Sequence, residues 1–386
     1  MDTTNSTKTP TSPVWAILRN EKPHRFVYAP NYWQWFTHRL NHNNVPKEIK
    51  HCKTQLDVIQ YLNLDVFSRN IYSDPYKYWF GGLSAEIFDG VESREMSHQD
   101  GKDISREKIY NTKNGRLTER LRYVMNESTL VTEKYLIDDY KNQLAAFKEF
   151  IQARSWRFDA EKYKTIQNSV ENRGVVIAGE LCSPLKMLHF YVGLIDTTYL
   201  LVDFEKKALE LMQIHEEQQL ELLKQMLQAG VKVVMSMDNL DASFHPPDYV
   251  EKYSASFYEK ASALAHQYKS RFFIHACGQQ KANLSLISSL GVDGLEGLVY
   301  PPLGDIEMEE ALKMTHDRFI ITGGISAHET RNLTEKKEIF DYVKNLFDRV
   351  RPYSNRFIFS ASCNTAIDTS WETIKHFRDA WSEYNS

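Results

Sequence analysis

The sequence has no uninterrupted apolar run of about 18 residues, the length that a helix needs to span a bilayer. It also has no basic arm or stripe, and its formal net charge is −4, so nucleic acid is a poor candidate partner. Short internal repeats are absent as well. We therefore expect no membrane association and no binding of nucleic acid.

Cysteine is scarce, with four in 386 residues: Cys52, Cys182, Cys277 and Cys363. The N-terminal stretch M-D-T-T-N-S-T-K-T-P-T-S-P is polar and has no hydrophobic signal region, so we expect a disordered lead-in over 1–12 and a cytoplasmic protein. In the cytoplasm these cysteines are expected to be reduced thiols, metal ligands or nucleophiles rather than disulfides.

Short β-branched or aromatic runs alternate with stretches of helical spacing. The apolar fraction of 42% is enough for a sizeable core. Strands that alternate with helices indicate a parallel sheet, and eight such units favour a closed (β/α)8 (TIM) barrel, with a doubly wound open sheet as the other architecture to consider. The expected strands are 25–30, 64–70, 174–180, 231–238, 271–277, 292–298, 318–324 and 356–363.

A β-rich insertion is expected after the second strand, at about 82–170, within a single barrel domain over 13–386. The stretch Lys113-Asn114-Gly115 is a hairpin-turn signal, which predicts a small β excursion. The stretches 138–151 and 159–170 then have helical spacing.

The stretch F-F-I-H-A-C-G places His275 and Cys277 at the end of the fifth expected strand. If the strand continues to Cys277, both side chains point to one face, which suits either packing or a shared metal. Cys363 follows the last strand, and barrel closure brings strand ends to one mouth. One imidazole and two thiolates suit an open zinc site, with Glu180, or alternatively Cys182, as a candidate fourth ligand.

Other polar and aromatic residues at expected strand ends have two readings each. Asp238 and Asn239 either cap a helix and shape a turn or hydrogen-bond to a ligand or a zinc-bound histidine. Glu296 is either a catalytic carboxylate or a salt-bridge partner. The aromatic residues Tyr32, Trp33 and Trp35 belong either to the core or to a pocket at the mouth.

These stretches resemble the uroporphyrinogen decarboxylase superfamily, and within it the zinc-dependent, corrinoid-linked methyltransferases. The resemblance covers about 14–384 and rests mainly on I-H-A-C-G, L-G-V-D-G-L-E, R-F-I-I-T-G-G-I and S-A-S-C-N. The segments M-D-N-L-D, H-P-P-D-Y and N-G-R-L-T-E-R also match. The resemblance implies a (β/α)8 barrel whose pocket lies at the C-terminal mouth.

The resemblance also separates two activities within the superfamily. Its decarboxylases use no metal and hold porphyrin carboxylates with an N-terminal arginine pair, whereas here A-P-N-Y-W-Q-W-F-T-H-R-L has aromatic residues in that place. Its methyltransferases carry H-x-C and a distant cysteine as zinc ligands, and the matching residues here are His275, Cys277 and Cys363. The resemblance therefore implies a zinc enzyme.

The chain looks similar to the methyltransferase I component of phenyl methyl ether O-demethylases. The implied reaction takes the methyl group of an aryl methyl ether, such as a guaiacol-, veratrole- or vanillate-like compound, to cob(I)alamin on a partner corrinoid protein. Zinc is expected to act as a Lewis acid, with Asp238 and Glu296 as candidate catalytic residues. The candidates for binding the substrate are Tyr32, Trp33, Trp35, Asn70, Tyr72, Trp79 and Asn239.

Three alternatives stay open at this point. One is a methylcobamide:thiol methyltransferase of the coenzyme M type, and another is a metal-free enzyme like uroporphyrinogen decarboxylase. The third is a barrel with a closed structural zinc that only binds a ligand. The sequence leaves the oligomeric state open, a homodimer included.

Overall fold

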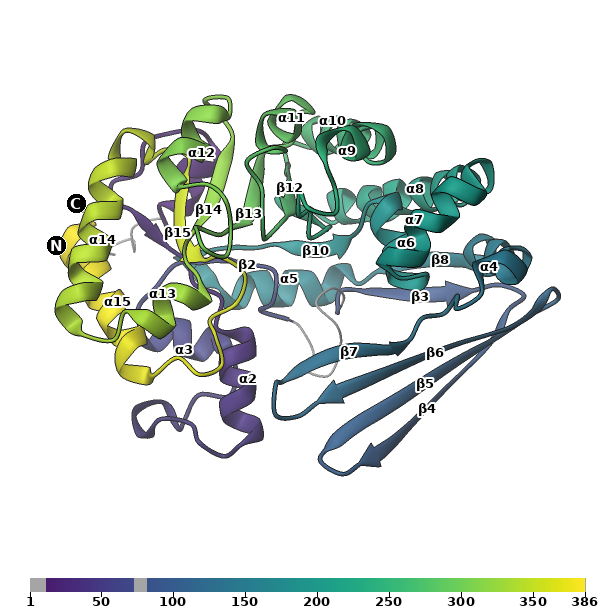
Figure 1. Ribbon diagram of the computed structural model, residues 1–386. Helices are drawn as coiled ribbons and strands as arrows, with labels where there is room; N and C mark the ends of the chain where they lie inside the picture. The colour runs from purple at the N-terminus through teal and green to yellow at the C-terminus, as the bar shows by residue number, and fades with distance from the viewer. Residues whose placement is uncertain (1–11, 73–81, 386) are drawn as a thin grey trace, which may run out of the picture.

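The computed structural model describes residues 12–72 and 82–385 (Figure 1). The expected lead-in lies outside these residues except for Ser12, and so does Trp79. In this part of the chain no single helix has the length and apolar composition to cross a bilayer. The pair Pro184–Tyr191 and Leu194–Asp203 meets these criteria only together, with a bend of 115° between them.

The fold is a mixed α/β barrel of parallel strands. Seven strands form one sheet in the order β1-β15-β14-β13-β12-β11-β10, and β2 pairs with β9, which leads directly into β10. The Asp65 N–H donates to the Tyr28 carbonyl at 3.0 Å and links the β1 and β2 segments. The strands are β1 (Val27–Tyr28), β2 (Val66–Ser68), β9 (Gly174–Val176), β10 (Ala178–Leu181), β11 (Val233–Met237), β12 (Arg271–His275), β13 (Gly294–Leu298), β14 (Ile320–Ile325) and β15 (Phe357–Ala361).

All eight expected strands are confirmed, with the third built from β9 and β10. Strand order follows chain order from β10 through β15 to β1, as in a (β/α)8 barrel, so the doubly wound alternative is wrong.

Helices follow the strands and cover the outside of the barrel. Helix α14 shows why: its buried residues Ile339, Val343, Leu346 and Val350 recur at helical spacing on one face. The helical segment over 247–267 is divided into two helices, because the backbone breaks at Ser254. The helices are α1 (Val14–Leu18), α2 (Trp33–Asn41), α3 (Gln55–Tyr61), α6 (Pro184–Tyr191), α7 (Leu194–Asp203), α8 (Glu205–Gln228), α9 (Pro247–Tyr253), α10 (Ala255–Gln267), α11 (Leu284–Ser289), α12 (Met308–Met314), α13 (Ala327–Asn332), α14 (Lys336–Val350) and α15 (Trp371–Tyr384), with 3-10 turns at Lys47–Ile49, Glu171–Arg173 and Arg351–Tyr353.

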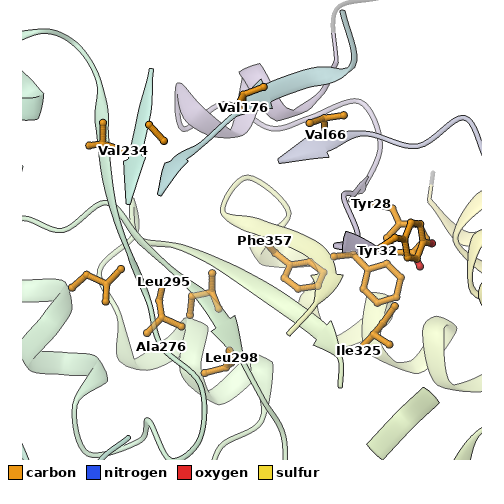
Figure 2. Close-up of a cluster of buried hydrophobic side chains, with 14 of the residues drawn as sticks. Tyr28, Tyr32, Val66, Val176, Val234, Ala276, Leu295, Leu298, Ile325 and Phe357 are labelled. Atoms are coloured by element: carbon orange, nitrogen blue, oxygen red, sulfur yellow. The ribbon is translucent and has the colours of Figure 1, made fainter. Parts of the chain in front are cut away.

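Alternation along each strand divides the core into two layers. On β12, Phe272 and Ile274 join the layer under the helices, whereas Phe273 lies in a separate cluster with residues of six other strands and α1. Members of the layer under the helices, such as Val234 and Leu295, are drawn in Figure 2. Because side chains alternate between faces, His275 shares the inward face of Phe273.

The insertion lies between β2 and β9 and projects away from the barrel (Figure 1). Strands β3 (Ser84–Phe88) and β8 (Arg154–Phe158) pair antiparallel, and between them a four-stranded sheet, called the meander below, consists of β4 (Glu92–Asp100), β5 (Asp103–Thr112), β6 (Gly115–Val124) and β7 (Thr129–Lys134). The hairpin turn predicted at Lys113-Asn114-Gly115 is confirmed: Thr112 pairs with Gly115, and Lys113 and Asn114 connect the two strands. Helices α4 (Tyr140–Ala153) and α5 (Ala160–Ser169) confirm the two expected helices.

Candidate metal centre

His275 and Glu296 lie side by side inside the barrel mouth. They are register partners on the adjacent strands β12 and β13, and both are buried. The His275 Nδ1 hydrogen-bonds to the Glu296 Oε2. Gly297 makes this approach possible, because a Cβ at that position would lie 3.2 Å from the His275 Cε1 and 2.8 Å from two backbone carbonyls. The carboxylate fixes the ring so that Nε2 is the free nitrogen.

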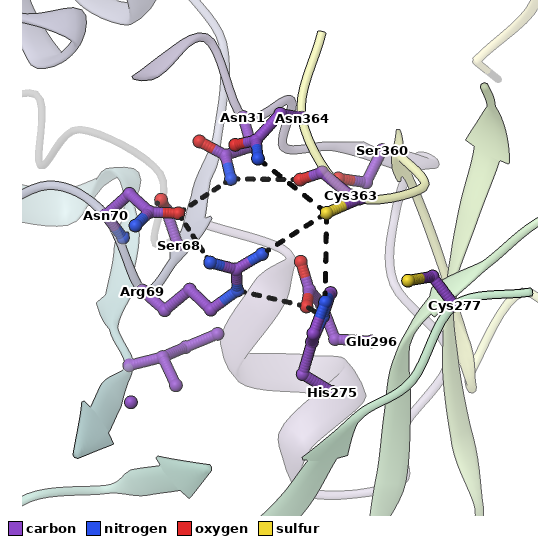
Figure 3. Close-up of polar contacts among 12 residues, drawn as sticks. Asn31, Ser68, Arg69, Asn70, His275, Cys277, Glu296, Ser360, Cys363 and Asn364 are labelled. Atoms are coloured by element: carbon purple, nitrogen blue, oxygen red, sulfur yellow. Dashed lines mark hydrogen bonds and ion pairs between the residues drawn. The ribbon is translucent and has the colours of Figure 1, made fainter. Parts of the chain in front are cut away.

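Cys363 lies directly after β15 and faces this free nitrogen (Figure 3). The distance between the Cys363 Sγ and the His275 Nε2 is 3.7 Å. Two ligands of one tetrahedral zinc, at Zn–S of about 2.3 Å and Zn–N of about 2.0–2.1 Å, stand roughly 3.6 Å apart. The pair therefore has the spacing of two ligands of the same metal ion.

Cys277 lies in the loop after β12, which ends at His275 rather than at Cys277. The loop is locked to the one after β11, because the Asn239 N–H donates to the His275 carbonyl at 2.9 Å. Gly278 has φ +90°, and a Cβ there would lie 1.9 Å from the Asp241 Oδ2, so only glycine suits the turn. The Cys277 Sγ lies 3.9 Å from the Asn239 Oδ1.

The surroundings of Cys363 and Cys277 move the pKa values of these two thiols in opposite directions. A hydrogen bond from Cys277, together with the positive charges of His275 and Arg69, lowers the pKa of Cys363 well below its usual value despite burial. The same hydrogen bond raises the pKa of Cys277. Burial lowers the pKa of His275, but the Glu296 carboxylate outweighs burial and raises it to about 9. Cys363 is therefore the thiolate of the pair.

Arg69, which follows β2, completes this network and was given no role in the sequence analysis. Its Nε donates to the Glu296 Oε2 at 3.2 Å, its Nη2 lies 3.7 Å from the Cys363 Sγ, and its Nη1 donates to the Asn70 Oδ1 at 2.8 Å. The Asn31 Nδ2 also donates to the Asn70 Oδ1, at 2.8 Å. A buried arginine needs an acidic partner. The position of Arg69 directly after an apolar run could therefore have indicated that it pairs with a carboxylate inside the protein.

The donor set matches zinc in its chemistry. In residues 12–72 and 82–385, no three His, Cys, Asp or Glu side chains form a group that could hold a metal ion as they stand. His275 and Cys363 nevertheless have ligand spacing, and interaction with Cys363 raises the pKa of Cys277. One imidazole and two sulfurs are ligands that zinc accepts, and magnesium and calcium do not favour sulfur. These three residues would hold the metal.

Glu180 is directed away from this pair, contrary to the expectation of a fourth ligand. The register of β10 against β11 shifts between Ala178 and Leu181, and Gly179 is the residue that faces Arg69. The Glu180 carboxylate instead accepts hydrogen bonds from the Ser84 hydroxyl and from the Leu83 N–H. Burial raises its pKa. Glu180 thus fastens the insertion to the barrel.

The other polar candidates have structural partners. The Asp238 carboxylate accepts from the Ser183 N–H at 2.7 Å and from the Tyr258 hydroxyl at 2.9 Å. The Cys182 Sγ lies 3.5 Å from the His215 Nε2, and burial raises the pKa of Cys182 to about 12. Neither contact involves His275 or Cys363.

The aromatic candidates divide between core and mouth. Tyr32 and Trp35 are 1% and 0% exposed, and Trp35 stacks on Trp371 with ring centroids 5.9 Å apart. This burial argues against contact with a substrate. Trp33 is only partly buried, and the Tyr72 hydroxyl donates to the Ile177 carbonyl at 3.0 Å.

Comparison with known proteins identifies the family. A model of the uroporphyrinogen decarboxylase (URO-D) family matches residues 141–384, which is more than half of the chain. The chain belongs to the URO-D family. No curated protein matches this URO-D family member in sequence.

Solved structures are similar in fold. A methyltransferase from Methanosarcina mazei has a TM-score of 0.59 and 14% sequence identity, covering 96% of this URO-D family member and 97% of that chain. At this identity the likeness shows the fold alone. A D-psicose 3-epimerase from Clostridium cellulolyticum H10 has a TM-score of 0.33 and 9% identity over 65% of this chain and 94% of that chain, too low to support an argument.

Proposed function

We propose that this protein is a zinc-dependent methyltransferase that demethylates an aryl methyl ether and passes the methyl group to cob(I)alamin on a partner corrinoid protein. The observation that carries the proposal is the His275–Cys363 pair, with 3.7 Å between Nε2 and Sγ and with the Glu296 carboxylate behind the imidazole. Membership of the URO-D family and the fold shared with a methyltransferase support it.

The residues around the pair prepare it for a metal. Glu296 orients the imidazole of His275, and Arg69 holds Glu296 in place while its charge faces the Cys363 sulfur. The Asn364 side-chain amide also points at this sulfur, with Nδ2 at 3.7 Å. Zinc held here would supply Lewis acidity to the departing phenolate oxygen. A phenol has a pKa near 10 against about 15.7 for water, so an aryl ether has the easier leaving group.

The arrangement favours this activity over a metal-free decarboxylase. Arg69 is paired with Glu296 and bonded to Asn70, so it is engaged inside the protein rather than free to hold a substrate carboxylate. The thiol-acceptor alternative uses the same metal, and only the choice of substrate separates it from the proposal.

Metal analysis combined with turnover tests the proposal. We expect about one zinc per chain, lost in Cys363→Ser and in His275→Ala together with methyl transfer from guaiacol, veratrole or vanillate to cob(I)alamin. Cys182→Ser is the matched control, because this thiol is buried at the end of β10 and contacts His215 instead. It should keep both zinc and activity.

Each alternative has its own readout. Full activity in metal-free protein would overturn the proposal. Methyl transfer from methylcobalamin to a thiol, without activity on any ether, would assign the coenzyme M type of reaction. Release of carbon dioxide from a porphyrinogen without metal would assign a decarboxylase.

A further inference from the structure

A cavity of about 480 Å³ lies between the meander and the flank of the barrel. Its walls come from the meander, β3, β8 and α6, and none of His275, Cys277 and Cys363 lines it. Cavities that bind small molecules typically measure about 300–1,000 Å³. The cavity is therefore large enough for a ligand and is separate from the candidate metal centre.

The meander turns charged residues toward this cavity. Alternate residues of β5 share one face of the sheet: Arg106, Lys108 and Tyr110. Tyr110 packs on Phe150 of α4, with ring centroids 4.7 Å apart, as a core-facing residue should. Arg106 and Lys108 instead line the cavity. A sheet face that covers a core is usually apolar, so this half of the face is built for something polar.

The side chains that line the cavity carry four basic groups (Arg94, Arg106, Lys108 and Arg154) and three carboxyl groups (Glu86, Glu95 and Glu119), a formal excess of one positive charge. Glu95 and Glu119 are the cross-strand register partners of Lys108. In the described part of the chain, neither Arg106 nor Lys108 has an ion pair within 4.0 Å. Glu86, by contrast, is engaged by Arg154 at 3.7 Å and by the Tyr191 hydroxyl at 3.3 Å. Burial raises the pKa of Glu119 to about 7, so this carboxyl is partly neutral near pH 7.

The opposite wall is aromatic, and its rings already face a cation. The Arg154 guanidinium lies 5.3 Å from the centre of the Trp156 ring and 5.5 Å from that of Tyr191. These are cation–π distances, so a cationic ligand would compete with a buried arginine for the same rings. A flat ring with a negative charge suits this cavity better.

We propose that the cavity binds an aromatic carboxylate of the benzoate class, with the carboxylate near Arg106 and Lys108 and the ring against Trp156 and Tyr191. Arg106 and Lys108 are two residues apart on one face of β5, roughly 7 Å along the strand, so both long side chains can reach one carboxylate. The ligand is either a methoxybenzoate or its demethylated product, which share this chemistry. The choice of these two ligands rests on the proposed function, whereas binding of an aromatic carboxylate to this cavity does not.

Calorimetric titration of the full chain with benzoate tests the charge and the ring. Arg106→Gln and Lys108→Gln should each weaken benzoate binding at least tenfold. Arg120→Gln is the matched control, because Arg120 lies on the opposite face of the meander and pairs with Glu107 at 3.5 Å, and it should leave the affinity unchanged. Benzamide and cyclohexanecarboxylate should bind more weakly than benzoate.

Further measurements distinguish binding in this cavity from binding at the candidate metal centre. Cys363→Ser should retain benzoate affinity, and loss of binding in that variant would move the site to the metal centre and overturn the inference. Tighter binding of benzyltrimethylammonium than of benzoate, or no binding of benzoate, would also overturn it. The relative affinities of 4-methoxybenzoate and 4-hydroxybenzoate identify which of the two sources is preferred.

Discussion

The substitution Glu296→Gln tests how the barrel supports its candidate metal centre. Glutamine keeps the size of the side chain and can still accept from the His275 Nδ1–H, but it removes the negative charge. Loss of a carboxylate that supports a metal-binding histidine typically lowers metal affinity by about 10- to 100-fold, or roughly 1.4–2.7 kcal/mol. We expect a loss of zinc affinity in this range, measured by competition with a chromophoric chelator.

The same substitution leaves Arg69 buried without its counter-charge. The pair is close, with the Arg69 Nε at 3.2 Å from the Glu296 Oε2, and both side chains are at most 7% exposed. Breaking a buried pair costs about 3–5 kcal/mol. For 386 residues, with an unfolding entropy of about 2.1 cal/mol/K per residue, this corresponds to a fall in Tm of about 4–6 °C.

A second variant separates the two effects. Glu296→Gln combined with Arg69→Met removes the uncompensated charge, so most of the lost Tm should return while zinc affinity stays low. Zinc affinity equal to that of the wild type in Glu296→Gln would refute the role given to the carboxylate. An unchanged Tm would refute the energetic account of the Arg69 pair.

Three further outcomes are expected. The His266 Nε2 lies 2.8 Å from the Asp293 Oδ2, and this contact raises the pKa of His266. The ion pair therefore stabilises the folded protein fully below pH 6.5, and this stabilisation is lost as the pH rises through the raised pKa. The difference in Tm between wild type and His266→Gln should therefore narrow above pH 6.5, and a gap that widens would contradict the assignment. Trp35→Ala should cost about 3–5 kcal/mol in denaturant unfolding, whereas Trp35→Phe should leave the KM for the ether unchanged; a raised KM would return this residue to the pocket. Gly278→Ala should lower both Tm and zinc affinity, because its Cβ would lie 1.9 Å from the Asp241 Oδ2; adding Asp241→Ala should recover part of the loss, and unaltered zinc binding in the single variant would contradict the role of the turn.

Much of the barrel could be predicted because buried parallel strands are short apolar runs and helices repeat with a different period. The same pattern placed His275 and Cys363 at strand ends, and closure of the barrel brings their side chains together. The direction of Glu180 could not be predicted, because a register shift in β10 reverses which residue faces inward. Trp35 follows β1 as a mouth residue would, and only packing against Trp371 shows that it belongs to the core.

The partner of Arg69 could not be predicted from the sequence, for a different reason. Glu296 lies 227 residues further along the chain, and no local pattern links the two. The hydrophobic periodicity of a helix or strand shows which of its faces is buried. It does not show which residue on another strand neutralises a buried charged side chain. The sequence therefore pointed to His275, Cys363 and Glu296 of the candidate centre, but not to Arg69, which pairs with Glu296.

The contacts around Arg69 also bear on the order in which the chain assembles. They join residues 227 and 294 positions apart, and the Asn31 contact with the Cys363 carbonyl spans 332. Closing such long loops is entropically expensive, so these contacts form late in folding. On a ribosome, Arg69 emerges long before its acid and its thiolate, and the centre is complete only once β15 joins β1. If the centre binds zinc as proposed, the metal would favour the closed barrel, so saturating zinc should slow separation of the first and last strands.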